Sequence, residues 1–210
     1  MRMIESILAD AAAIAAVRRD IHAHPELCFQ EKRTSDVIAK QLTDWGIPVH
    51  RGMGRTGVVG IVKNGSSTRA VGLRADMDAL PMTEHNTVAH ASQHAGKMHA
   101  CGHDGHTAML LAAAKHLSKH RNFDGTVYLV FQPAEEGGGG AREMMSDGLF
   151  EKFPMQAVFG MHNWPGRKGA SGSSPVASCS RLWRMWAISG TCEISCWPNS
   201  SWRSACAPST

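Results

Sequence analysis

The sequence has no apolar run long enough for a transmembrane helix, because charged side chains interrupt every apolar stretch before about 18 residues. It also lacks a basic stripe or an alternation of basic and aromatic residues, and its net charge is only +4, so nothing points to a nucleic-acid partner. The apolar stretch at residues 3–17 is interrupted by Glu5 and Asp10 and has a helical period, which argues against a signal peptide. We therefore expect a soluble cytoplasmic protein that binds neither membrane nor nucleic acid.

The sequence does contain a dense group of metal-binding residue types. His99, Cys101, His103, Asp104 and His106 fall within eight residues. Zinc, manganese and cobalt bind thiolate, imidazole and carboxylate groups, and a site needs at least three such groups at one point. A polar loop with exposed histidines is the alternative, but the density of ligand types favours a metal site.

Two adjacent glutamates, Glu135 and Glu136, follow an apolar run at residues 126–131 that predicts a buried strand. Because neighbouring carboxylates repel each other, we expect one to hold a counter-charge while the other can carry a proton. Such a pair suits a metal hydrolase, in which one glutamate binds the metal and the other accepts a proton from water. A solvated acidic turn is the alternative when the pair is considered alone.

Two further predicted strands also end in polar residues. Residues 70–75 lead into Asp76 and Asp78, and residues 157–161 lead into His162. In open α/β sheets, ligands gather at the carboxyl ends of the strands. Asp76 and Asp78 could instead be a capping or turn pair.

The remaining periodicity predicts helices and strands in alternation, which is typical of an α/β fold. Residues 35–45 and 106–120 have a helical pattern, and residues 58–62 a strand pattern. We expect the helix at 106–120 to begin beside the metal-binding loop, which is the segment 98–106 with the clustered histidines and Cys101.

Five motifs occur in order along the chain, DIHAHPE at 20–26, LRADMDALP at 73–81, MHACGHDGHT at 98–107, QPAEEG at 132–137 and GMHN at 160–163. Together they resemble the hippurate hydrolase branch of the aminoacylase and carboxypeptidase-type metallopeptidases. That branch includes bacterial N-acyl amino acid amidohydrolases and plant auxin-conjugate hydrolases. The resemblance implies a three-layer α/β sheet with helices on both faces, here as part of the catalytic domain of a two-metal exopeptidase-like fold.

The resemblance also implies a site for two divalent ions, zinc, manganese or cobalt, whose ligands fall on Cys101, His103, Glu136 and His162. Glu135 takes the position of the general base, and Asp78 that of the aspartate that orients a metal ligand from outside. The implied substrate is a small N-acyl amino acid such as hippurate, whose amide bond is hydrolysed to a carboxylic acid and a free amino acid. No individual role follows for Asp76, Asp104 or His106.

The character of the sequence changes after Gly166. Residues 167–210 contain four cysteines, four tryptophans, eleven serines, one acidic residue and no histidine, without a sustained amphipathic period or a bounded strand. A cysteine-rich zinc module is the alternative, but the spacing of these cysteines fits no paired-knuckle pattern. We therefore expect residues 1–166 to be the N-terminal part of the amidohydrolase catalytic domain and residues 167–210 to be an aberrant, out-of-frame and poorly structured tail.

In the family, a lid and dimerisation domain follows this point, as does a further histidine ligand. Neither is recognisable here, so we expect little or no activity from this chain and no family-type homo-oligomer. The first alternative is a metal-binding fragment without catalysis. The second is a redox or structural cysteine protein that acts through its tail, and it is disfavoured because all five motifs precede the tail.

Overall fold

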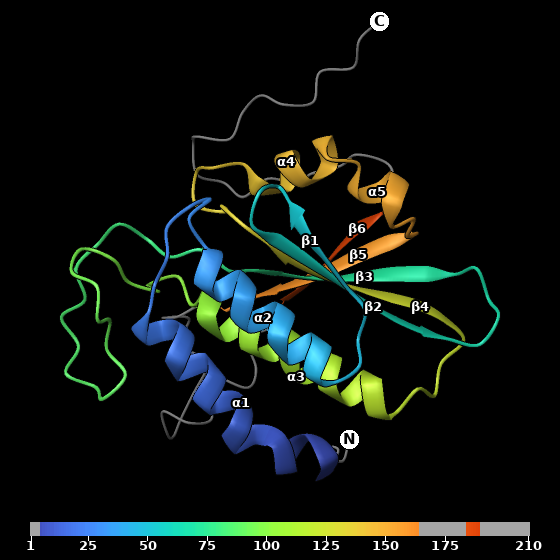
Figure 1. The fold of residues 1–210 in the computed structure, drawn as a ribbon, viewed down its shortest axis with the longest axis horizontal. Coiled ribbons are helices and arrows are strands. Elements are labelled where there is room, and N and C mark those ends of the chain that lie inside the picture. Colours follow the sequence, from blue (N-terminus) through green and yellow to red (C-terminus); the bar gives the residue numbers. More distant parts are fainter. Residues whose placement is uncertain (1–4, 164–183, 190–210) are drawn as a thin grey trace, which may run out of the picture.

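The computed structural model describes residues 5–163 and 184–189, which form one six-stranded sheet with helices on both faces (Figure 1). The strands are β1 (Val49–Met53), β2 (Gly57–Asn64), β3 (Ala70–Asp76), β4 (Gly125–Gln132), β5 (Ala157–His162) and β6 (Arg184–Ser189). The helices are α1 (Glu5–Ala23), α2 (Lys32–Asp44), α3 (His103–Lys119), α4 (Gly140–Ser146) and α5 (Leu149–Lys152).

The strand order is β1-β2-β4-β3-β5-β6, and β3 lies parallel to both β4 and β5. The other neighbouring pairs are antiparallel. Because β3, β4 and β5 run in the same direction, their carboxyl ends meet at one edge of the sheet. This topology brings together three chain segments that are far apart in the sequence.

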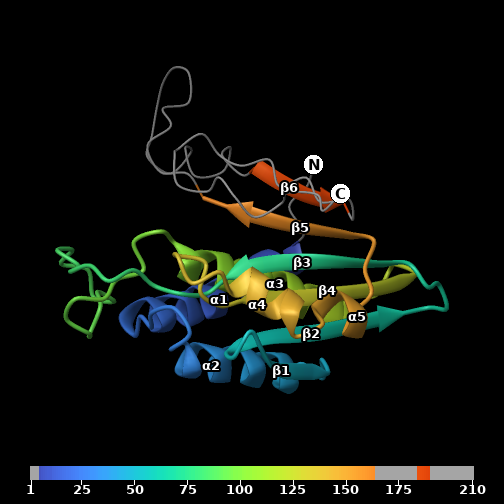
Figure 2. The same ribbon diagram turned by 90° about the horizontal axis from the view of Figure 1, so that it is seen from above.

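Alternate side chains of β4 divide the core into two layers. Leu129 and Phe131 are fully buried in a cluster with residues of α2 and α3, whereas Val130 packs with Met144 of α4 and Leu149 of α5. Figure 1 shows α1, α2 and α3 on one side of the sheet and α4 and α5 on the other. Figure 2, seen from above, shows the strands side by side in the order β1-β2-β4-β3-β5-β6. The predicted three-layer α/β architecture with helices on both faces is confirmed.

The strands and helices predicted from the sequence are all present, with small shifts of their ends. Helix α3 begins at His103 rather than at His106, because Gly102 adopts a φ of 91° that turns the chain into the helix. The first turn of α3 therefore carries both histidines. Strand β1 and helices α4 and α5 were not predicted.

Strand β6 is a correction to the sequence analysis, which expected no strand after residue 166. It pairs antiparallel with β5. The outer edge of β5 presents backbone groups that an extended segment can pair with, whatever its hydrophobic pattern. The rest of residues 167–210 lies outside the described residues, so the division of the chain at residue 166 stays a prediction.

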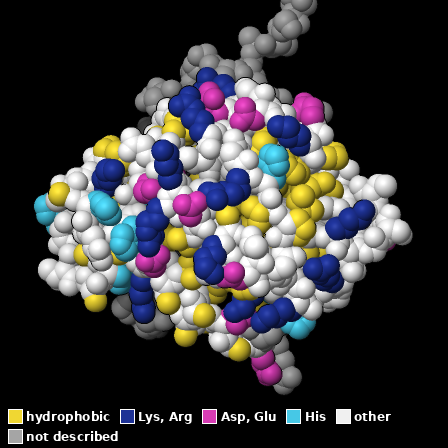
Figure 3. All heavy atoms as spheres, viewed as in Figure 1, with side chains coloured by type: hydrophobic (Ala, Val, Ile, Leu, Met, Phe, Trp, Pro, Cys, Tyr) yellow, Lys and Arg dark blue, Asp and Glu magenta, His cyan; other side chains and the backbone are white. Residues whose placement is uncertain are grey.

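Among the described helices, none combines the length and the apolar character that crossing a membrane would require. Figure 3 shows basic and acidic side chains spread among apolar ones over the face that it draws.

The position of the site depends on the packing of β4, which Leu129 anchors from the middle of the strand. Leu129 is fully buried, so Leu129→Ala should lower the free energy of unfolding by about 2–5 kcal/mol through lost burial and a residual cavity. Urea denaturation followed by circular dichroism would measure this change. Val88→Ala, at a half-exposed position, is the control. Equal denaturation midpoints for the two variants would contradict this account of the core.

Candidate metal centre

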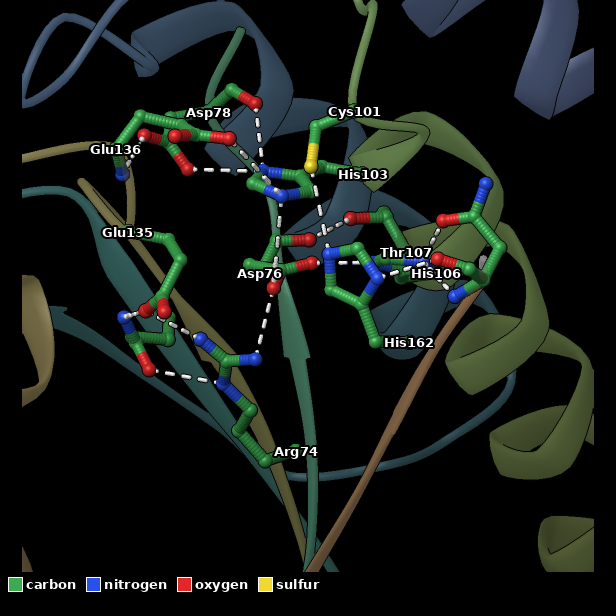
Figure 4. A network of polar contacts seen from close by, with 12 residues as sticks. Arg74, Asp76, Asp78, Cys101, His103, His106, Thr107, Glu135, Glu136 and His162 are labelled. Atoms are coloured by element: carbon green, nitrogen blue, oxygen red, sulfur yellow. Dashed lines mark hydrogen bonds and ion pairs between the residues drawn. The ribbon is translucent and has the colours of Figure 1, made fainter. Parts of the chain in front are cut away.

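The polar residues that follow the three parallel strands lie together at the carboxyl edge of the sheet. Asp76 ends β3, His162 ends β5, and the turn after β4 carries Glu135 and Glu136. His103 approaches the same point from the first turn of α3 (Figure 4). These side chains therefore meet at the edge where the sequence analysis expected ligands, and their roles as ligands stay a prediction.

The four predicted metal ligands, Cys101, His103, Glu136 and His162, are neighbours. Cys101, His103 and Glu136 each offer a ligand atom, and these atoms lie within 4.8 Å of one another. The Sγ atom of Cys101 is 3.3 Å from Nε2 of His162. One sulfur, two imidazoles and one carboxylate form a donor set that suits zinc or a similar divalent ion.

The environment of His103 fits a metal ligand. Its Nδ1 lies 2.9 Å from the backbone oxygen of Asp78 and 3.1 Å from the carboxylate of the same residue. Its Nε2 is buried and has no hydrogen-bond partner within the described part of the chain, although Glu136 lies 3.8 Å away. When Nδ1 donates its proton to Asp78, the lone pair of Nε2 is left facing the other candidate ligands.

Asp78 also orders the turn that carries the glutamates. Its carboxylate accepts a hydrogen bond of 2.9 Å from the backbone N–H of Glu136. Burial raises the pKa of Asp78, but the hydrogen bonds from His103 and from the Glu136 backbone outweigh burial and hold it below its usual range. An ionised Asp78 therefore orients both an imidazole and a backbone turn, which is the position expected of an orienting residue outside the ligand set.

The charge around His103 is strongly negative. Burial lowers the pKa of His103, but Asp78, Cys101 and Asp76 together raise it to about 11. The ionised carboxylates of Asp76 and Asp78 would also stabilise a metal cation at this point, and a divalent ion at Nε2 would replace the proton. The centre is built to hold positive charge.

Asp76 lies within a second group of possible ligands, together with His103, His106 and His162. The Asp76 carboxylate lies 2.6 Å from Nδ1 of His106, and the backbone oxygen of Asp76 accepts a hydrogen bond from the hydroxyl of Thr107. Burial raises the pKa of Asp76, but Arg74, His106 and His103 hold it well below its usual range. Asp76 is thus a buried permanent anion in contact with the site, rather than the capping pair with Asp78 that the sequence left open.

Two residues of the metal-binding motif, Asp104 and His99, lie outside both groups of candidate ligands among the described residues. The Asp104 carboxylate pairs with Nδ1 of His22 at 2.8 Å and with Nε of Arg18 at 2.7 Å, both on α1. His99 is buried, and burial lowers its pKa to about 4. Their density in sequence therefore overstated the number of ligands.

The sequence analysis missed Arg74. Its guanidinium bonds the carboxylates of Asp76 and Glu135, and the side-chain oxygen of Gln132. The sequence could have indicated Arg74, because a charged residue inside the apolar run 70–75 needs a buried partner of opposite charge.

A family model, that of peptidase family M20/M25/M40, matches residues 72–205. This chain therefore belongs to peptidase family M20/M25/M40. The match continues past residue 166, where the sequence analysis expected the family character to end.

Individual relatives agree with this family. The chain is 50% identical over 165 residues to the hippurate hydrolase of Campylobacter jejuni, covering 79% of this chain and 43% of the relative. It is 49% identical over 150 residues to the IAA-amino acid hydrolase ILR1-like 4 of Arabidopsis thaliana, covering 71% of this chain and 33% of the relative. The chain thus spans less than half of the length of these two relatives.

A solved structure supports the fold. The YXEP protein of Bacillus subtilis, described as a dinuclear metal binding peptidase of the M20 family, superposes with a TM-score of 0.72 and 40% sequence identity. The superposition covers 76% of this chain and 45% of that protein. The resemblance inferred from the five motifs is confirmed at the level of family and fold.

The convergence of ligands predicts that the chain retains a divalent ion. Cys101→Ser replaces a potential thiolate by a neutral hydroxyl, so it should weaken zinc binding. Zinc content after dialysis against a weak chelator, measured by atomic emission, would test this. Cys28→Ser is the matched control, because Cys28 lies outside both groups of candidate ligands among the described residues, and a serine hydroxyl can still donate to Asp78 and to the backbone oxygen of Glu136, as the Cys28 thiol does. Equal zinc content in the unchanged chain and in Cys101→Ser would refute the assignment of Cys101.

Proposed function

We propose that this chain is part of a metal-dependent amidohydrolase that cleaves N-acyl amino acids of the hippurate type to a carboxylic acid and an amino acid. The observation that carries the proposal is the meeting of Cys101, His103, Glu136 and His162 at one edge of the sheet, beside a second glutamate. The identity with a hippurate hydrolase and with plant IAA-amino acid hydrolases supports this substrate class.

Two bound divalent ions, zinc, manganese or cobalt, would polarise the amide carbonyl and make water a stronger nucleophile. The residues of the chain would bind the ions, orient their ligands and transfer the proton. Cys101, His103, Glu136 and His162 would hold the ions. Asp78 fixes the orientation of His103 through its hydrogen bond to Nδ1.

Glu135 would accept and return the proton of the attacking water. Its side chain is 45% exposed at the carboxyl edge of the sheet, where a substrate can approach. As general base, its carboxylate takes a proton from the attacking water, and it then returns the proton to the nitrogen of the departing amino acid. We further propose a cytoplasmic location, because a reducing compartment keeps Cys101 available as a ligand.

A chimaera would test the proposal for the whole protein. Residues 1–163 of this chain would be joined to the remaining C-terminal part of the Campylobacter jejuni hippurate hydrolase. With added zinc or manganese, the chimaera should release benzoate and glycine from hippurate. A folded, metal-loaded chimaera that hydrolyses neither hippurate nor other N-acyl amino acids would favour metal binding without catalysis.

The role of Glu135 can be tested in the same chimaera. Glu135→Gln keeps the shape of the side chain and removes the proton acceptor, so kcat should fall by roughly 10²–10⁴-fold. Zinc content should stay unchanged, since Glu135 is not expected to bind the metal. Glu136→Gln is the matched comparison and should lower zinc content. If Glu136→Gln kept its zinc and lost only turnover, the two roles would be reversed.

A further inference from the structure

We propose that Arg74 is a positioning residue that determines which of two adjacent glutamates binds the metal: it holds the Glu135 carboxylate away from the ions and leaves Glu136 as the ligand. The proposal rests on the metal centre of the proposed function. It assigns a role to a residue that is neither a metal ligand nor a proton acceptor.

The two glutamates are neighbours in the chain and have the same chemistry, so residue type alone cannot separate their roles. Of these two glutamates, only Glu136 belongs to a group of candidate metal ligands among the described residues. Figure 4 shows the Glu136 carboxylate near His103 and the Glu135 carboxylate turned toward Arg74. Carboxylate oxygen is a good ligand for zinc, and a half-exposed glutamate can swing toward a cation unless another group holds it.

Arg74 holds Glu135 through a closed ring of hydrogen bonds. Its NH2 group donates to Oε2 of Glu135 at 2.6 Å, and Nε donates to the side-chain oxygen of Gln132 at 2.8 Å. The side-chain nitrogen of Gln132 donates to the same Oε2 of Glu135 at 2.7 Å. One carboxylate oxygen therefore receives two donors, one of them charged, which makes this a strong restraint.

The guanidinium is itself fixed in place. Its NH1 group donates to the Asp76 carboxylate at 2.7 Å, and Asp76 is completely buried. Asp76 on β3 and Gln132 on β4 are partners in the parallel ladder. The two residues that donate hydrogen bonds to Glu135 therefore lie on two strands of the sheet, and Glu135 itself lies on the turn after β4.

The test measures zinc coordination in the full 210-residue chain and needs no turnover. In Arg74→Met, Glu135 should be free to reach the metal. Zinc should then bind more tightly in competition with a chelator, because one more carboxylate oxygen can coordinate it. X-ray absorption at the zinc edge should show one more oxygen or nitrogen ligand for each sulfur. Arg69→Met is the matched control, because it removes one positive charge beside the opposite end of β3.

A double variant separates positioning from the loss of charge. Removing any nearby cation strengthens zinc binding through electrostatics alone, and that effect persists in Glu135→Gln. The extra ligand should appear in Arg74→Met and be absent from the Arg74→Met/Glu135→Gln double variant. Arg74→Lys keeps the charge and one donor group, so its zinc should have the same coordination number as in the unchanged chain.

Arg74→Met leaves the buried Asp76 without its cation, so folding must be checked by circular dichroism. If that variant does not fold, Gln132→Met decides instead, since it removes one of the two donors to Glu135 and keeps Arg74. Gln132→Met should also add an oxygen or nitrogen ligand to the zinc.

Unchanged zinc coordination in the folded variants, with zinc still bound, would overturn the role of Arg74 and leave the proposed function intact. Failure of the unchanged chain to bind zinc would overturn the metal centre itself, and this inference with it.

Discussion

The carboxylate of Asp76 is completely buried, and the site is organised around the negative charge that it carries. An ionised group without water is tolerated only when it is paired and hydrogen-bonded. Arg74 supplies a full positive charge from the same strand, and His106 supplies a ring nitrogen from the first turn of α3. The demand for charge compensation therefore links the sheet to the helix that carries the metal-binding loop. Glu135 and Glu136 add further negative charge at the same edge, which explains why the centre suits divalent cations.

The opposite side of the metal-binding loop is held by a second polar network. Asp104, in the first turn of α3, pairs with His22 of α1, and His22 also reaches Glu84 in the segment before the loop. The hydrogen bond to Asp104 raises the pKa of His22 despite the opposing effect of burial. A histidine with a raised pKa stabilises the fold at lower pH, and this contribution is lost as the pH rises through the raised value. The ligands Cys101 and His103 thus lie between two networks that fix the loop from both sides.

The local pattern of the sequence was sufficient for the elements that build the site. The strand at 126–131 was predicted from a short apolar run with β-branched and aromatic residues, and the helix beside the metal-binding loop from a segment rich in alanine and leucine. Residue type at the strand ends was also informative, since thiol, imidazole and carboxylate groups are the side chains that bind divalent ions. The family could be inferred because five short motifs occur in one order. Strand β6 was missed, because pairing with the edge of β5 depends on backbone groups that every residue possesses.

The sequence by itself determined which chemistry the chain can support, because ligand types and the periods of helices and strands are local properties. Only the tertiary structure decided which of the clustered residues share the site. His103 and Asp104 are adjacent in the chain, but the structure places His103 against Asp78 and Asp104 against His22 of α1. Successive residues of a helix point in different directions. The structure also separated Glu135 from Glu136 through Arg74 on a neighbouring strand. That contact spans 61 positions, and no local pattern encodes which partner a buried charge will find.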